Sequence, residues 1–307
     1  YATGAVSGDK AGGLVGESYS IIRQAYATGA VTGVDGVGGL IGYQAGGVIF
    51  DSYATGAVTG VSEFGGLVGH QESGSDIVNS FFDSYSTMQG GAVGTQDGTV
   101  STVTAVTSDP LQSAAANYAY KKNAYTTAPS WTFTPTPGGS GWYMIEGQTR
   151  PFGAWEYSQN ITNSHQLQLV NMDLAASYTL GRDLDLAGKF GRAGVASPTA
   201  AQSAGMWNRG FVPLGTDGLT YLGTGAAAGF TGSFTGLGHT ISNLTVDNGS
   251  DYAGLFGYSQ GPVSDIGLID ASVKGSNWVG GLAGWQNGDV TGAYVSGTVS
   301  SSKGAVG

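Results

Sequence analysis

Cysteine is absent from the 307-residue chain, which excludes a disulfide-stapled scaffold and any cysteine-ligated metal centre. Charge is also scarce: the sequence has 11 basic and 21 acidic residues, and its formal net charge is −10. Because so few basic residues cannot form a positive stripe that neutralises phosphates, we expect no binding to nucleic acid. No apolar run approaches the length of about 20 residues that a membrane-spanning helix needs, so we expect no membrane span.

Glycine is the residue that the chain has in excess, at 56 positions. A helix-rich fold is not expected, because glycine in a helix interior costs about 1 kcal/mol relative to alanine. Collagen is excluded because the glycines do not fall at every third residue and only 8 prolines are present. Disorder fits poorly, since 40% of the residues are hydrophobic. The glycines therefore need a structural explanation.

The sequence repeats itself. The pattern Gly-Gly-Leu-Val-Gly, with small variations, occurs at residues 12–16, 38–42, 65–69 and 280–284. The pattern Tyr-Ala-Thr-Gly-Ala-Val, again with variations, occurs at residues 1–6, 26–31, 53–58 and 294–299. Successive leucines of the first pattern lie 26 or 27 residues apart, as shown by Leu14, Leu40 and Leu67, and by Leu255 and Leu282. A period of this length is typical of repeat architectures.

Each repeat contains short apolar runs separated by turn residues, which predicts an all-β fold. A propeller blade would need about 40 residues. One coil of a right-handed parallel β-helix, or β-solenoid, fits the shorter repeat, with about three strands of roughly 4–6 residues per coil stacked at about 4.8 Å. We expect the glycines at the corners of the coils, where glycine adopts a positive φ without steric cost.

Stacking of the coils places equivalent residues in columns. The leucines should form inward columns. A second column follows the leucine motif and should face outward, because its members differ widely in chemistry; it contains Glu17, Tyr43, His70, Tyr258 and Trp285. Trp278 is also expected to point outward. The next position predicts a ladder of paired side-chain amides, formed by Gln44, Gln71 and Gln286.

These motifs as a set resemble the GLUG-motif repeats of large secreted bacterial adhesins that are similar to filamentous haemagglutinin. Residues 167–186 and 211–246 look like the lead-in to such an array, 80–87 like its closing repeat, and 131–157 like its terminal segment. The resemblance implies a non-enzymatic, extracellular structural or adhesive segment at a bacterial cell surface, which mediates attachment or matrix assembly. Surface glycans or proteins of a host or neighbouring cell are the partners that it implies.

The order of the motifs predicts three parts. Residues 1–89 would be the end of a first solenoid array, 90–160 an irregular closing or linker segment, and 161–307 the lead-in coils and start of a second array. Because the sequence from Tyr294 can be laid on the sequence from Tyr1, we expect an excerpt of a longer protein with tandem modules of roughly 290 residues. Such rods can also self-associate, along or beside their axis.

Catalytic residues are not evident, and we expect no cofactor or metal. The three histidines, His70, His165 and His239, show no metal-ligand spacing. A Gly-x-Ser-x-Gly match makes Ser259 a formal candidate nucleophile, but that motif works in a strand–turn–helix context. Here it lies at a repeat corner, which favours a chance match.

Asp183 and Asp185 allow an alternative hypothesis about the function of the chain. As neighbours on one face of a strand they suit the paired carboxylates of a glycosidase, which would make the chain a polysaccharide-binding or polysaccharide-degrading solenoid. The competing interpretation is a strand that buries Leu184 and Leu186 and leaves both acids in solvent. We expect the second arrangement and no enzyme activity.

Tyr258, Trp278 and Trp285 are the strongest binding candidates, because exposed aromatic faces stack on sugar rings or pack into protein interfaces. The alternative is that these rings cover one another as an exterior ladder. Three Asn-x-Ser/Thr sequons are candidate glycosylation sites, although such tripeptides are common by chance in this composition; they begin at Asn160, Asn243 and Asn248.

Overall fold

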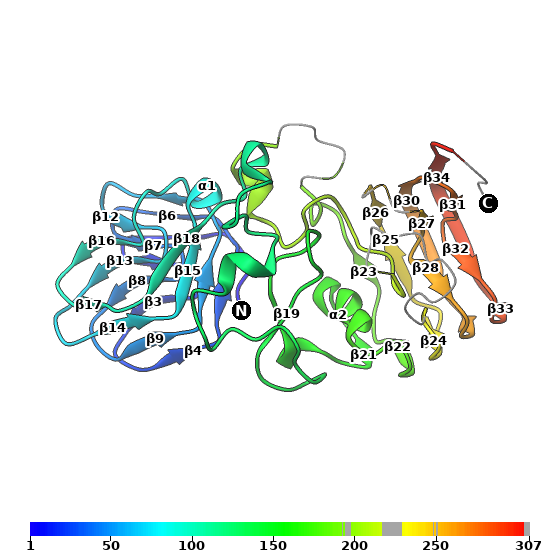
Figure 1. The fold of residues 1–307 in the computed structure, drawn as a ribbon, viewed down its shortest axis with the longest axis horizontal. Coiled ribbons are helices and arrows are strands. Elements are labelled where there is room, and N and C mark those ends of the chain that lie inside the picture. Colours follow the sequence, from blue (N-terminus) through cyan, green and yellow to red (C-terminus); the bar gives the residue numbers. More distant parts are fainter. Residues whose placement is uncertain (192, 194–197, 217–228, 248, 250, 304–307) are drawn as a thin grey trace. The chain divides into compact units, whose positions relative to one another are not determined.

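The computed structural model describes residues 1–191, 193, 198–216, 229–247, 249 and 251–303 (Figure 1). The chain divides into two compact units. Unit 1 contains Tyr1–Phe133 and Ala196–Met206, and unit 2 contains Thr134–Val195 and Trp207–Gly307. The coils of both units are built from strands that pair in parallel with the equivalent strands of neighbouring coils. The predicted all-β parallel solenoid is therefore confirmed.

Unit 1 begins with β1 (Val6–Gly8) and then forms two complete coils. The first contains β2 (Ala11–Gly12), β3 (Val15–Ser18), β4 (Ile22–Arg23), β5 (Tyr26–Ala27) and β6 (Val31–Gly33). The second contains β7 (Asp35–Gly38), β8 (Ile41–Gln44), β9 (Val48–Phe50), β10 (Tyr53–Ala54) and β11 (Val58–Thr59). The expectation of three longer strands per coil is wrong, because each coil here is built from five segments of two to four residues.

Two further coils follow in unit 1, and Figure 1 draws all of these strands from blue to green. The third coil contains β12 (Ser62–Gly65), β13 (Val68–Gln71), β14 (Asp76–Val78) and β15 (Ser80–Asp83). The fourth contains β16 (Val93–Gln96), β17 (Thr99–Val100) and β18 (Val103–Val106). The short helical turns are α1 (Ser84–Thr87), η1 (Pro110–Gln112), η2 (Lys122–Tyr125) and η5 (Ala201–Ala204).

The leucine column forms the centre of the unit 1 core, as the sequence predicts. Leu40 and Leu67 are completely buried, and Leu14, in the first coil, is half-buried against them. The backbone N–H of Leu14 donates to the carbonyl of Leu40 at 2.9 Å, and that of Leu40 donates to Leu67 at 2.8 Å. Each coil thus buries its apolar side chains against its neighbours, which makes stability quasi-one-dimensional.

The glycines of the repeated motif allow the backbones of adjacent coils to approach closely, and do not form corners with a positive φ as expected. Gly12, Gly38 and Gly39 do not have a positive φ. A Cβ added to Gly12 would lie 2.5 Å from the nitrogen of Gly42, and one on Gly38 would lie 2.6 Å from the nitrogen of Gly69. These glycines are therefore required because the backbones of adjacent coils approach each other closely.

Polar residues turn one of the corners instead. Gln24, Asp51 and Asn79 occupy equivalent positions in three successive coils and have φ values of 48°, 49° and 49°. Asn and Asp tolerate this left-handed conformation better than most residues do, since their short polar side chains bond to the local backbone. The prediction that glycine forms the corners is wrong at this column.

A ladder of tyrosines lies on the opposite face of β5 and β10 from the core alanines. The rings of Tyr26 and Tyr53 are stacked at 4.9 Å with an interplanar angle of 1°, and both are almost fully buried. Trp131 covers this ladder: its ring lies 6.1 Å from that of Tyr53 and 4.8 Å from that of Phe81. The Trp131 indole N–H also donates to the carbonyl of Asn79 at 2.8 Å.

Unit 2 builds its coils from a different set of strands. One five-stranded sheet contains β21 (Asn160–Ile161), β22 (Tyr178–Leu180), β24 (Phe234–Thr235), β29 (Val263–Ser264) and β33 (Val290–Thr291). Another contains β23 (Leu184–Asp185), β25 (Thr240–Ser242), β26 (Thr245–Val246), β30 (Gly267–Gly275) and β34 (Tyr294–Ser301). The last two pairs are β27 (Tyr252–Ala253) with β31 (Trp278–Val279), and β28 (Phe256–Ser259) with β32 (Ala283–Gln286).

Unit 2 also contains helical turns and one antiparallel pair of strands, which lie in the sequence before β22. The pair is formed by β19 (Trp142–Tyr143) and β20 (Phe152–Gly153), and the helical turns are η3 (Ala154–Glu156), α2 (Ser164–Leu169) and η4 (Val170–Met172). The side chain of Asn163 caps α2 by accepting from the N–H of Gln166 at 3.0 Å. Leu167 and Leu169 of α2 are completely buried in unit 2. The array limits expected after residues 89 and 160 stay predictions.

Candidate functional site

The aromatic residues singled out in unit 2 come together on the outside of two adjacent coils. Tyr258 of β28 pairs in register with Trp285 of β32, and their rings are stacked at 6.3 Å with an angle of 21°. Trp285 is 43% exposed and Tyr258 is half-buried. Trp285 therefore presents aromatic surface to solvent in a position that the strand pairing fixes.

Trp278 joins the same surface through Tyr252, a residue that the sequence did not single out. Tyr252 and Trp278 are paired in register, with rings 4.7 Å apart at an angle of 10°. The ring of Tyr252 also meets that of Tyr258 edge-on at 6.1 Å. We call these four residues, Tyr252, Tyr258, Trp278 and Trp285, the aromatic cluster. Tyr252 lies one repeat before Trp278, and that 26-residue spacing is the signal that reveals it in the sequence.

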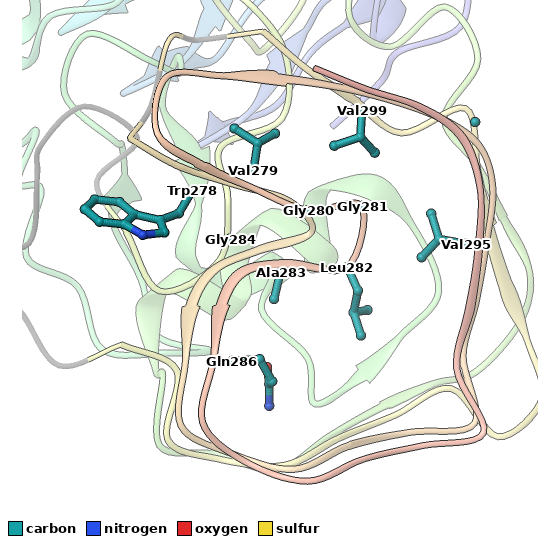
Figure 2. Close-up of a pocket in the computed structure, with 11 residues that line it drawn as sticks. Trp278, Val279, Gly280, Gly281, Leu282, Ala283, Gly284, Gln286, Val295 and Val299 are labelled. Atoms are coloured by element: carbon teal, nitrogen blue, oxygen red, sulfur yellow. The ribbon is translucent and has the colours of Figure 1, made fainter. Parts of the chain in front are cut away.

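The arrangement combines both alternatives that the sequence left open. The rings stack on one another as an exterior ladder, and Trp285 also remains exposed. Figure 2 shows the indole of Trp278 on the outside of its coil, in contrast to Leu282, which points into the enclosed space. The role of Tyr258, Trp278 and Trp285 as ligand contacts stays a prediction.

The equivalent column of unit 1 is polar and internally paired. The rings of Tyr43 and His70 are stacked at 4.5 Å. The Lys10 ammonium lies 3.9 Å from the centre of the Tyr43 ring, and Nδ1 of His70 lies 3.0 Å from a carboxylate oxygen of Glu63. A hydrogen bond from the Tyr43 hydroxyl to Glu72 is the main cause that raises the pKa of Tyr43 to about 12. These partners leave less free ring surface than unit 2 offers.

The carboxylates of Asp183 and Asp185 lie in solvent beside a strand that buries Leu184 and Leu186, as expected. Asp183 accepts a hydrogen bond from the backbone N–H of Thr240 at 2.8 Å, which is the largest cause of its lowered pKa. Asp185 accepts from the backbone N–H of its neighbour Ala187 at 2.9 Å, and this bond likewise lowers its pKa. Both groups are thus stabilised as anions.

The other candidate catalytic residues have structural partners. Ser259 is completely buried, and its hydroxyl donates to the carbonyl of Gly261 at 3.3 Å. Nδ1 of His165 lies 2.8 Å from Glu156, and both side chains are almost fully buried. Nδ1 of His239 lies 3.2 Å from Asp183. Within the described residues, no group of three or more histidines and acids is placed to hold a metal ion.

The predicted ladder of paired glutamine amides is wrong. Gln44 and Gln71 are buried, and each side-chain amide donates to a backbone carbonyl, Gln44 to Asp76 at 3.0 Å and Gln71 to Thr99 at 2.8 Å. In unit 2, Gln286 donates to the carbonyl of Gly261 at 2.9 Å. The side-chain amides of these glutamines therefore donate to main-chain carbonyls and not to the glutamine of the adjacent coil.

The sequons differ in their surroundings. Asn160 is exposed at the start of β21. Asn243 is half-buried with a φ of 58°, and its amide donates to Asp185 at 2.8 Å. Asn248 lies outside the described residues.

Among the helices that the structure describes, none combines the length and apolarity needed to cross a bilayer.

Comparison with known proteins agrees with the repeat analysis. The family model of the GLUG motif matches residues 33–59, which contain the second coil of unit 1. Over 176 residues, or 55% of the chain, the sequence is 34% identical to Halomucin of Haloquadratum walsbyi, and the aligned region spans 2% of that protein. No solved structure matches the chain. The chain thus contains a GLUG repeat and is similar to part of a far longer protein, whereas the resemblance to filamentous haemagglutinin stays a prediction.

Proposed function

We propose that this chain is a non-enzymatic segment of a long, repetitive extracellular protein that forms part of a cell surface and attaches it to glycans. The GLUG match and the similarity to Halomucin support a repetitive surface protein with a β-solenoid. The parallel stacking supports a structural role, because each coil orders its neighbours without disulfides. An acidic chain with a net charge of −10 also keeps a long β-surface soluble.

The observation that carries the adhesive part of the proposal is the exposed Trp285 within the aromatic cluster. A ring that is stacked on Tyr258 and fixed by strand pairing offers a preorganised face. A ring that is already fixed loses little conformational entropy when a ligand binds to it. Flat aromatic faces stack on the apolar side of sugar rings, so a polysaccharide is the ligand class that fits best.

Glycan-array binding tests this proposal. The native chain should bind a subset of polysaccharides, and the double variant Trp278→Ala, Trp285→Ala should bind at least about tenfold more weakly, which corresponds to about 1.4 kcal/mol. The matched control is Leu111→Ala, which removes another exposed apolar side chain from unit 1. Equal binding by the double variant and the native chain would remove the aromatic cluster as the ligand site.

The polysaccharide-degrading alternative has weaker support. A glycosidase needs one carboxyl group with a raised pKa to act as a general acid beside an ionised partner. Hydrogen bonds lower the pKa of both Asp183 and Asp185. The lowered pKa values therefore favour a structural role for the two carboxylates, which accept hydrogen bonds near β23 and β25.

A further inference from the structure

One short segment of the chain belongs to a different unit from the residues on either side of it. Residues Thr134–Val195 and Trp207–Gly307 form unit 2, whereas Ala196–Met206, which lie between them in the sequence, are part of unit 1. We call the described residues of this segment, 198–206, the clasp. In the sequence the clasp lies between β23 and β24, and it contains the helical turn η5. The chain therefore leaves unit 2, docks in unit 1 and returns.

Two hydroxyl groups of unit 1 hold the centre of the clasp through its main chain. The Thr55 hydroxyl donates to the carbonyl of Ala204 at 2.6 Å. The Tyr120 hydroxyl lies 3.3 Å from the carbonyl oxygens of both Ser203 and Gly205, so its proton is shared between two acceptors. Tyr120 and Ser203 are completely buried. The clasp is thus docked through its backbone carbonyls.

Two further tyrosines of unit 1 hold the ends of the clasp. Tyr85, in α1, donates its hydroxyl to the carbonyl of Pro198 at 3.1 Å. The hydroxyl of Tyr53, from the tyrosine ladder, lies 3.4 Å from the sulfur of Met206, which is buried. The eight residues before that methionine, Pro-Thr-Ala-Ala-Gln-Ser-Ala-Gly, have small or polar side chains. Because apolar stabilisation scales with the area buried, the clasp is held mainly by its hydrogen bonds.

The strand that supplies part of this docking surface is anchored more firmly than the clasp. β10 pairs in parallel with β5 on one side and with β15 on the other. The backbone N–H of Tyr53 donates to the carbonyl of Ala25 at 3.0 Å, and that of Thr55 donates to Ala27 at 3.0 Å. Segments with few buried apolar contacts open at a lower free energy than core strands do. The clasp can therefore open while β10 stays in its sheet.

We propose that residues 198–206 act as a releasable clasp, which opens by itself while the coils of unit 1 stay folded. When it is docked, the clasp ties the chain of unit 2 to unit 1 in addition to the peptide bond between Phe133 and Thr134. When it is released, it gives up that tie and uncovers the hydroxyls of Thr55 and Tyr120. This inference concerns a conformational change within the chain and holds independently of glycan binding.

Hydrogen exchange of the whole chain, followed by mass spectrometry, tests the release. In the native chain the amides of the clasp, including that of Ser203, which donates within the clasp to Thr199, should exchange at least about tenfold faster than those of β10, because local opening needs less free energy than global unfolding. The double variant Thr55→Val, Tyr120→Phe removes two of the hydroxyls that hold the clasp. It should speed exchange in the clasp by at least about a further fivefold and leave exchange in β10 unchanged.

Two controls separate the loss of these hydroxyls from a general effect of substitution. The double variant Tyr19→Phe, Thr104→Val also removes two hydroxyls, which bond to Glu17 and Thr127 and not to the clasp. It should leave exchange in the clasp at the native rate. Thr55→Ser keeps a hydroxyl at the position that bonds to the clasp, and it should exchange more slowly in the clasp than Thr55→Val does.

Three results would overturn the proposal. A common exchange rate for the clasp and β10 in the native chain would show that the clasp does not open by itself. Equal exchange of the clasp in the native chain and in Thr55→Val, Tyr120→Phe would show that these hydroxyls do not hold it. Faster exchange of β10 and the clasp by the same factor in that variant would show that the hydroxyls stabilise the whole unit instead. The first comparison uses the native chain alone, so it does not depend on the folding of any variant.

Discussion

At the scale of single residues, the high glycine content reflects close packing of backbones more than corner geometry. In the Gly-Gly-Leu motif, a Cβ on Gly12 or Gly38 would collide with the backbone of the adjacent coil. The corner at Gln24, Asp51 and Asn79 uses polar residues in the left-handed region. Composition alone cannot distinguish glycines that form corners from glycines that allow a close approach of two backbones, because both raise the glycine content in the same way.

Gly39→Ala tests the close-packing explanation. The new Cβ would overlap the carbonyl of Gly66 and lie 2.8 Å from the Cβ of Ala54, and overpacking of this kind costs about 1–3 kcal/mol. We expect the free energy of unfolding, measured with urea, to fall by that amount. Gly90→Ala is the control, since a Cβ at that position would have no atom within 4 Å. Equal stability of the two variants would show that the motif glycine is dispensable.

At the scale of strands and coils, the sequence predicts the repeat well and the shape of the coil less well. The 26–27-residue period, the leucine column and the pairing of Tyr258 with Trp285 follow from spacing, and the strand register confirms them. The five short segments per coil do not follow, because apolar periodicity marks which residues face inward without marking where the backbone bends. Trp131, which covers the tyrosine ladder, lies in a segment without repeats. The position of Trp131 could therefore not be predicted from the periodicity of the sequence.

Asp183 and Asp185 predict a pH dependence at the junction of β23 and β25. Hydrogen bonds from Thr240 and Ala187 lower their folded-state pKa values, below the unfolded value of about 3.9. Their stabilisation is therefore complete above that value and is lost as the pH falls through the lower, folded-state values. Melting curves from pH 6 to pH 2 should show a steeper loss of Tm for the native chain than for Asp183→Asn, Asp185→Asn. Asp9→Asn, which changes an exposed acid of unit 1, should follow the native curve. Parallel curves for the native chain and the double variant would contradict the assignment.

At the scale of the whole molecule, the proposed function rests on the repetition of coils and on the aromatic cluster. Unit 2 carries the aromatic cluster, in which Trp285 is exposed, and unit 1 carries a polar column whose side chains pair with one another. Sequence spacing located the outward positions, but it could not show that His70 pairs with Glu63 while Trp285 stays exposed. Those outcomes depend on side chains that meet across coils.

The most direct test of the proposed function is the labelling of intact source cells with antibodies raised against the folded chain. An extracellular surface segment predicts strong labelling without permeabilisation, and no increase after the cells are opened. Labelling that appears only after permeabilisation would contradict the proposal that this solenoid is displayed at the cell surface.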